Sequence, residues 1–356
     1  MKYYSLTNIL KKKATYNMII GERSNGKTFA CLKHGLQQYK KTGGRLAIIR
    51  RWDEDFKGRR AATMFDALKA EGVIKDLFPD YDTVVYYRSM WYLAKYENGK
   101  VVKDTEPFAY AFSLSTMEHD KSTSYPLVTT ILFDEFITRD HYLPDEFKLF
   151  QNTISTIVRQ RENVQIFMCA NTVDRYNIYF EEMGLHHAHE QEQGTIDVYK
   201  YGNSEMTVAV EYCSSSSGKA SDKYFAFDNP SLKMITGGSW EIDIYPHLPI
   251  KYKPKDIVSK FYIVFNHALI QGNFISINNE TFIYFHKKTT PLKEEEEDII
   301  YSPDYDYRFN HKRNLLKATD NYSALINRFF RNDKVFYQTN ELGEVIRRYV
   351  MWCEEQ

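Results

Sequence analysis

The first stretch of this chain whose residues could do chemistry is YNMIIGERSNGKTFA, at residues 16–30. Gly21, Gly26, Lys27 and Thr28 fit the G-x-x-x-x-G-K-[ST] spacing of a phosphate-binding loop. The glycines let backbone N–H groups curl around phosphate oxygens, and the helix that follows adds its positive N-terminal end. In such a loop the lysine reaches the β- and γ-phosphates while the threonine hydroxyl holds Mg²⁺. We therefore expect a nucleotide and Mg²⁺ to bind here, with further loop contacts from Arg23, Ser24 and Asn25.

A pair of acids follows the apolar stretch ILF at residues 131–133. We expect Asp134 to bind Mg²⁺ through water, opposite Thr28, and Glu135 to polarise the attacking water as a general base. A glutamate directly after the Mg²⁺ carboxylate is typical of the additional-strand, catalytic-glutamate class of ATPases. The alternative is a surface pair of acids, which the apolar strand before it disfavours. The pattern predicts hydrolysis of ATP.

Positive charge for the transition state is expected from the stretch IVRQREN, which contains Arg159 and Arg161. In ring ATPases an arginine at this place reaches the γ-phosphate of the neighbouring subunit. Two arginines two positions apart point to different faces of a helix, so we expect only one to act as this finger. For either arginine the alternative is a surface ion pair. Asn171 follows the apolar stretch VQIFMCA and is placed to contact the γ-phosphate or its water, a turn or N-cap role being the alternative.

Strands and helices must bring these residues together. Four apolar, β-branched stretches predict buried parallel strands, and helical patterns lie between them. This predicts an α/β P-loop NTPase of the additional-strand class, with a parallel sheet in a three-layer arrangement. The expected strands are 17–20, 45–49, 128–133 and 164–170, and the expected helices are 28–38, 53–77 and 143–161.

The amino-acid composition of the chain changes beyond about residue 205. The stretch CSSSSGKASD, at residues 213–222, is small and polar, which suggests a flexible segment. We therefore expect an ATPase domain at 1–205, a linker region at 206–253 and a second domain at 254–356. In the second domain the patterns predict strands at 260–265, 269–277 and 280–286 and helices at 321–332 and 340–351.

Composition narrows the classes of partner. Lys+Arg and Asp+Glu are both 47 in 356 residues, so any nucleic-acid contact must come from a local patch rather than from net charge. Lys121, in the polar loop before residue 128, would project into a central channel if subunits form a ring; a surface lysine is the alternative. Four widely separated cysteines indicate free thiols in a reducing cytoplasm. Since no apolar run reaches membrane-spanning length, we expect no membrane partner.

Together these stretches resemble the genome-packaging ATPases of phi29-like, short-tailed phages. The resemblance is strongest at GERSNGKTFA, IIRRW, LSTMEHDKSTSYPLVTTILFDEFI, VRQRENVQIFMCANTV and SKFYIVFNHALIQG. It implies a terminase-like ATPase domain and a small C-terminal α+β domain of RNase H-like fold without nuclease activity. It further implies a homomeric pentameric ring at the prohead portal, in the host cytoplasm, that drives double-stranded DNA inward. In some relatives a packaging RNA anchors the motor.

By position, the resemblance implies that Lys27, Thr28, Asp134 and Glu135 are catalytic. It likewise makes Arg159 the finger that acts in trans and Lys121 a DNA-gripping residue. The chain departs from the family pattern after IIRRW, where Trp52-Asp53-Glu54-Asp55 replaces a basic residue that the family can use near DNA. The second-domain strand segment FISI lacks the carboxylates that two-metal nucleases need, so we expect no cleavage. Two alternatives are a hexameric DNA translocase or helicase and a non-hydrolysing, nucleotide-gated adaptor.

Overall fold

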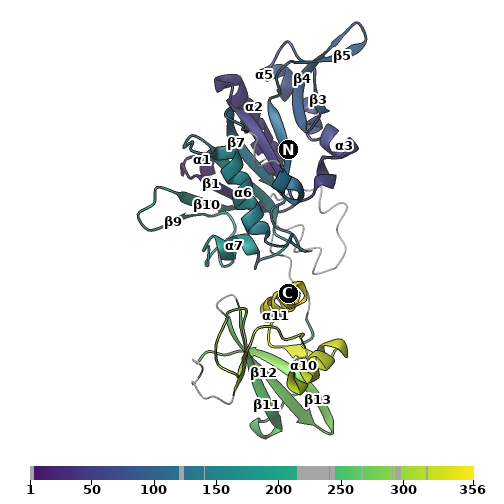
Figure 1. The fold of residues 1–356 in the computed structure, drawn as a ribbon, viewed down its shortest axis with the longest axis vertical. Helices are drawn as coiled ribbons and strands as arrows, with labels where there is room; N and C mark the ends of the chain where they lie inside the picture. The colour runs from purple at the N-terminus through teal and green to yellow at the C-terminus, as the bar shows by residue number, and fades with distance from the viewer. Residues whose placement is uncertain are drawn as a thin grey trace. The chain divides into compact units, whose positions relative to one another are not determined.

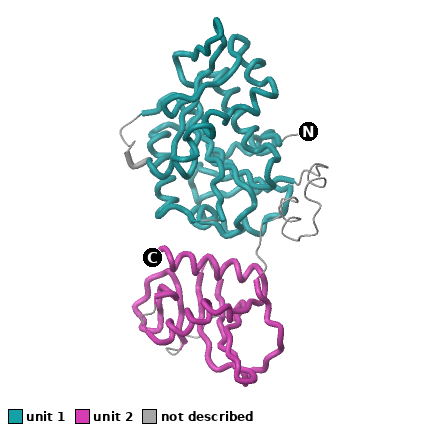
Figure 2. Tube along the Cα trace, turned by 90° about the vertical axis from the view of Figure 1, so that its right-hand side faces the viewer, with its two compact units in different colours: residues 1–241 teal, residues 242–356 magenta. Residues whose placement is uncertain are grey.

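The computed structural model describes residues 4–119, 124–139, 141–214, 240, 245–265, 268–290, 292, 298–317 and 320–356. The chain forms two compact units, residues 1–241 and 242–356 (Figure 2). Within the described ranges, no helix combines the length and the apolar character needed to cross a membrane.

A ten-stranded sheet forms the centre of the first unit (Figure 1). Its strand order is β3-β4-β6-β2-β7-β8-β1-β10-β9, with β5 paired to β4. The six strands from β6 to β10 in this order are parallel, and the four that the sequence predicts as buried and parallel are confirmed. The bounds are β1 (Tyr16–Gly21), β2 (Arg45–Arg50), β3 (Thr83–Tyr87), β4 (Met90–Glu97), β5 (Lys100–Lys103), β6 (Ala109–Ser113), β7 (Val128–Asp134), β8 (Gln165–Asn171), β9 (Ile196–Lys200) and β10 (Thr207–Tyr212).

Helices cover both faces of this sheet. Successive side chains of a strand point to opposite faces, and β7 shows the consequence. Leu132 belongs to the core beneath α2 (Lys27–Thr42), while the ring of Phe133 stacks 5.3 Å from that of Phe150 in α6 (Glu146–Val158). The sheet therefore lies between two helical layers, as predicted. The other short helices of this unit are α1 (Thr7–Leu10), η1 (Asp53–Phe56), α3 (Gly58–Ala62), α4 (Asp66–Ala70), α5 (Val73–Leu77), η2 (Leu114–His119) and α7 (Ile178–Glu182).

Strand order also determines where the candidate residues meet. β8 lies between β1, which ends in the phosphate-binding loop, and β7, which ends in Asp134. In the parallel register Gly21 pairs with Asn171, and Asp134 pairs with Cys169. Because the carboxyl ends of parallel strands meet at one edge, the loop, the acids and Asn171 converge there.

Two predictions for this unit are wrong. The stretch 53–77 is not one helix but four short ones, and two of the three interruptions lie at Gly58 and Gly72, which adopt left-handed φ values of 55° and 74°. The linker region expected from residue 206 begins later, since β10 pairs in parallel with β1 inside the sheet. The buried residues of β10 precede the serine run, so the change in composition lies beyond this strand. The second unit accordingly begins at 242 rather than at 254.

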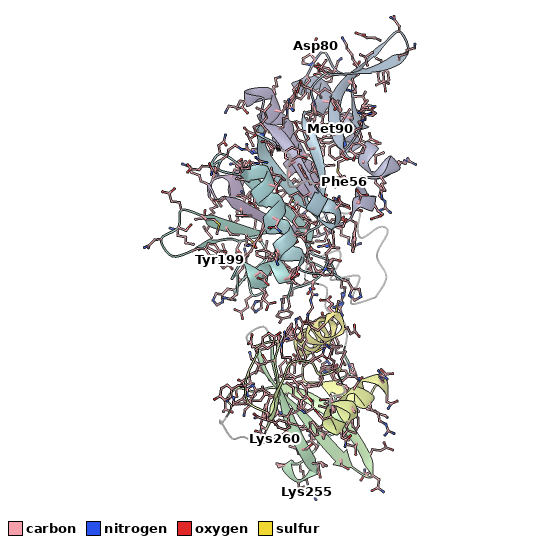
Figure 3. All side chains as sticks on the ribbon, viewed as in Figure 1. Phe56, Asp80, Met90, Tyr199, Lys255 and Lys260 are labelled. Atoms are coloured by element: carbon pink, nitrogen blue, oxygen red, sulfur yellow. The ribbon has the colours of Figure 1, made fainter. Side chains whose placement is uncertain are left out.

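The first unit's edge region is held by aromatic packing. Phe56, labelled in Figure 3, packs edge-on against Trp91 with ring centroids 5.8 Å apart. Trp91 is fully buried, and its indole N–H donates to the backbone carbonyl of Ala61 at 2.9 Å. A hairpin between β4 and β5 forms across Asn98-Gly99, a typical turn pair, and both residues have positive φ.

A six-stranded sheet in the order β15-β14-β11-β12-β13-β16 forms the second unit. The three predicted strands and two predicted helices are confirmed. Gly272 is required in β12, because a Cβ there would lie 2.5 Å from Phe261 Cζ and 2.9 Å from Phe285 Cε1. The elements are η3 (Pro254–Asp256), β11 (Ile257–Phe265), β12 (Ala268–Ile277), β13 (Glu280–Lys287), β14 (Ile299–Tyr301), β15 (His311–Lys312), α10 (Asn321–Arg331), β16 (Val335–Tyr337) and α11 (Asn340–Glu355).

Candidate active site

The loop between β1 and α2 wraps around the Lys27 side chain. The Lys27 ammonium donates to the carbonyl oxygens of Gly21 and Glu22 at 3.3 and 2.7 Å and to Asn25 Oδ1 at 3.2 Å. It also reaches Asn171 Oδ1 at 3.4 Å, so the polar residue expected at the end of β8 is at the loop. Lys27 is only 5% exposed. Burial lowers its pKa, and the nearby negative charge of Asp134 opposes that shift.

The glycines of the loop are required for different reasons. Gly26 has φ 92°, a left-handed conformation that lets the chain turn into α2. Gly21 has no room for a side chain, because a Cβ there would lie 2.9 Å from Cys213 Cβ. Cys213 follows β10, so this strand presses directly against the start of the loop. The four cysteines of the chain are unpaired and buried, as expected.

Thr28 and Asp134 meet although they are far apart in sequence. The Thr28 hydroxyl donates to Asp134 Oδ1 at 2.8 Å. Mg²⁺ accepts hydroxyl and carboxylate oxygens as ligands. Because the ion keeps most of its bound water, one or two protein ligands are sufficient to hold it. The pair therefore fits the expected Mg²⁺ position. The expected spatial meeting of the loop with the acid pair is confirmed.

Arg50, at the carboxyl end of β2, bridges both acids and was missed by the sequence reasoning. Its guanidinium contacts Asp134 Oδ2 at 2.5 Å and Glu135 Oε2 at 2.8 Å. Burial alone would lower the pKa of Arg50, but the charges of Asp134 and Glu135 outweigh it and raise the pKa. Glu135 itself has a side chain 62% exposed and a left-handed φ of 60°. The sequence feature that could have indicated Arg50 is a charged residue at the end of a buried strand that neighbours β7.

A cavity of about 630 Å³ lies over this edge of the sheet. It is lined by the loop from 23 to 28, by both acids and by the end of β8 at 169–171. Arg139, in the segment after the acids, also lines it. The cavity is large enough for a nucleotide-sized ligand, and cations and backbone donors surround it.

The two candidate finger arginines have different surroundings. Arg161 lies beyond the end of α6, and its guanidinium donates to the backbone carbonyls of Tyr125, Pro126 and Ile157 at 3.2, 3.0 and 2.6 Å and to that of Val128. Its own subunit therefore engages it. Arg159 is the exposed C-cap of α6 with φ 50°, and it does not line the described cavity.

Other charged candidates have local roles or are not described. Lys121 lies outside the described residues. Lys57 pairs with Asp53 at 2.7 Å and with Glu54 at 3.4 Å. Lys57 is thus paired with two of the acidic residues that depart from the family pattern. Over the described part of the chain, no group of three or more His, Cys, Asp or Glu side chains could hold a metal ion.

Comparison with known proteins identifies the family. The model of the family described as "Podovirus DNA encapsidation protein (Gp16)" matches residues 1–217. The chain belongs to this Gp16 family. This confirms the resemblance that the sequence motifs indicate.

Individual relatives of this Gp16 chain share part of its length. It is 33% identical over 172 residues to a DNA packaging protein of Bacillus phage B103, covering 48% of each chain. It is 29% identical over 181 residues to the DNA packaging protein of Bacillus phage phi29, covering 50% of this chain and 49% of that protein. The chain thus spans about half the length of the curated relatives it matches.

Two solved structures share the fold of nearly the whole chain. The bacteriophage Phi-29 viral genome packaging motor assembly matches with a TM-score of 0.61 at 21% identity, covering 99% of this chain and 98% of that chain. The Phi-28 gp11 DNA packaging motor matches with a TM-score of 0.56 at 17% identity, covering 99% and 96%. At these identities the likeness shows the fold alone.

Proposed function

We propose that this protein is an ATP-hydrolysing motor that moves double-stranded DNA into a phage prohead. The observation that carries the proposal is the contact of Thr28 with Asp134, beside Lys27 in its loop and with Glu135 next in the chain. Membership of the Gp16 family of encapsidation proteins adds the DNA and the prohead as the setting. The relatives' own names, DNA packaging proteins, agree with this setting.

The strand order supports the finer fold assignments that we propose. In the first unit, β8 lies between β1 and β7, and a strand inserted at this position supports the additional-strand assignment. In the second unit, β13, β12 and β11 are antiparallel neighbours, and β14 and β15 continue the sheet in parallel. This order is the one expected for an RNase H-like domain. We propose that this domain has lost nuclease activity.

Each site residue has a defined task in the proposed reaction. The amides and ammonium of the loop, from Gly21 to Lys27, hold the phosphates, and Asn171 lies within reach of the same ammonium. Thr28 and Asp134 hold Mg²⁺, which when bound neutralises phosphate charge. Glu135 accepts the proton of the attacking water; Arg50 engages its Oε2, so we assign Oε1 to the proton.

The ring supplies the remaining groups. We propose that Arg159 acts on the neighbouring subunit, because its side chain is exposed at the end of α6 and the guanidinium of Arg161 is directed at carbonyls within its own chain. Lys121 grips DNA phosphates without regard to sequence. The proposed partners are double-stranded DNA, the prohead portal and a packaging RNA. The proposed assembly is a homopentamer in the host cytoplasm, attached to the portal vertex during packaging.

Hydrolysis is tested by Glu135→Gln in a steady-state phosphate-release assay with DNA and proheads. We expect retained ATP binding and at least a roughly 100-fold loss of turnover, since general bases contribute at least that factor. Turnover within two-fold of the parent protein would remove Glu135 as the base. Mixed rings of Arg159→Ala and Glu135→Gln subunits test the finger: partial recovery is expected, and no recovery at any ratio contradicts action in trans.

A further inference from the structure

A second buried charge cluster lies beside the acid pair, and its arginine, Arg51, also lines the cavity described above. Arg51 is the residue after β2, and its guanidinium is directed at α6 rather than at Asp134. Its Nε contacts Glu146 Oε2 at 2.7 Å and its Nη2 contacts Glu146 Oε1 at 2.9 Å. The Arg51 and Glu146 side chains are 6% and 0% exposed. Glu146 is the first residue of α6.

The Glu146 carboxylate accepts hydrogen bonds from further groups besides Arg51. Tyr179 donates to Glu146 Oε1 at 2.7 Å, and the Leu143 amide donates to Glu146 Oε2 at 2.8 Å. Burial alone would lower the pKa of Arg51, but its hydrogen bonds and charge pairing with Glu146 raise it. Burial and the negative charge of Glu146 raise the pKa of Tyr179 well above its usual value. Arg51 therefore stays a cation and the Tyr179 phenol stays neutral.

The remaining donors of Arg51 are directed at the backbone of the catalytic segment. Nη1 donates to the carbonyl of Glu135 at 3.3 Å, and Nη2 donates to the carbonyl of Phe136 at 2.8 Å. Glu135 has φ 60°, a conformation that costs free energy for any residue with a side chain. Such a conformation persists only where its surroundings hold it. Arg51 supplies that restraint.

Stability alone does not account for a buried pair of this kind. Replacing a buried ion pair with apolar residues of similar volume is often neutral or stabilising. An apolar replacement cannot donate hydrogen bonds to the carbonyls of Glu135 and Phe136 while it also binds the carboxylate of Glu146. The planar, five-donor guanidinium has this capacity, and the ammonium of lysine does not.

We propose that Arg51 is a positioning residue for Glu135: clamped by Glu146 and Tyr179, it holds the left-handed backbone that aims the catalytic carboxylate. The inference rests on the proposed role of Glu135 as the general base. It also connects the base to α6, because the residue that clamps Arg51 begins this helix and Arg159 follows its end. A shift of α6 would therefore be felt at the backbone of Glu135.

The test replaces the cluster with apolar groups in the full-length protein through Arg51→Met, Glu146→Leu and Tyr179→Phe together. A second variant, Arg51→Lys, keeps the charge but loses the fork of donors. Each variant is measured for thermal unfolding, for affinity for a fluorescent ATP analogue, for kcat and KM, and for amide hydrogen exchange at residues 135–137. The parent protein and Glu135→Gln are the controls.

We expect both variants to bind the analogue within about three-fold of the parent, to lose at least ten-fold in kcat, and to exchange amides 135–137 at least ten-fold faster. A folded triple variant with parental kcat and parental exchange would overturn the inference. If the triple variant does not fold, Arg51→Lys decides by the same two readouts. Unchanged amide exchange at 135–137 in a folded variant contradicts the positioning role of Arg51. This holds even if Glu135→Gln shows that Glu135 is not the general base. The two failures are therefore distinguishable.

Discussion

Arg50→Ala is expected to destabilise the first unit substantially when no nucleotide is bound. The substitution leaves Asp134, whose side chain is 4% exposed, without its ion-pair partner at 2.5 Å. Removing one partner of a buried pair costs about 3–5 kcal/mol, and the 18% exposure of Arg50 places the cost near the lower end. The pair with the exposed Glu135 adds at most about 1 kcal/mol. We therefore expect a loss of about 3 kcal/mol.

Denaturant unfolding followed by intrinsic fluorescence measures this loss, and thermal unfolding is expected to shift by roughly 6–12 °C for a unit of this size. Arg45→Ala is the matched control, because Arg45 begins the same strand and pairs with Glu106, whose side chain is 63% exposed. The control should lose about 1 kcal/mol. Adding Mg²⁺ with a slowly hydrolysed ATP analogue should narrow the stability difference between Arg50→Ala and the parent protein, since the metal would then compensate the charge of Asp134. An Arg50→Ala loss no larger than the control's, without ligand, would refute the reasoning.

Two further predictions concern Arg159 and Arg161, at the end of α6, and Asp320 in the second unit. Arg161→Ala should cost about 2–3 kcal/mol in denaturant unfolding, because a charged donor to several carbonyls is removed. Arg159→Ala should cost at most about 1 kcal/mol, because the contacts of an exposed charged side chain are weak, but it should remove most turnover. Equal stability losses would contradict the distinction. The hydrogen bond from Lys312, with help from backbone amides, lowers the pKa of Asp320 to about 2, so its contribution is present above pH 4 and is lost as pH falls toward 2. Asp320→Asn should therefore flatten the acid limb of the second unit's stability profile, and an unchanged limb would contradict this assignment.

Sequence periodicity was sufficient for the elements whose signal is local. The buried parallel strands, the hairpin at Asn98-Gly99 and the three strands of the second unit all follow from residue types within each stretch. The meeting of Thr28 with Asp134 also followed, because parallel strands bring their carboxyl ends to one edge. The strands and the hairpin need no knowledge of distant partners, and the meeting of Thr28 with Asp134 needs only the parallel arrangement of the strands.

The missed residues depend on partners far along the chain. Arg50 and Arg51 carry no motif of their own, and their carboxylate partners lie 84 to 95 positions away. Arg50 ends β2 and contacts Asp134, whereas Arg51 lies just beyond the strand and contacts Glu146. β10 was missed for a related reason, since its pairing with β1 is non-local and the serine run beside it suggested a linker.

We propose that one site, built by the loop from Gly21 to Thr28 and by Asp134 and Glu135, powers DNA packaging. The most direct test is the amount of DNase-protected DNA in purified proheads, supplied with ATP and either the parent protein or Glu135→Gln. The account predicts protected, genome-length DNA with the parent and none above background with the variant, while both bind ATP. Equal protection with the two proteins would contradict it.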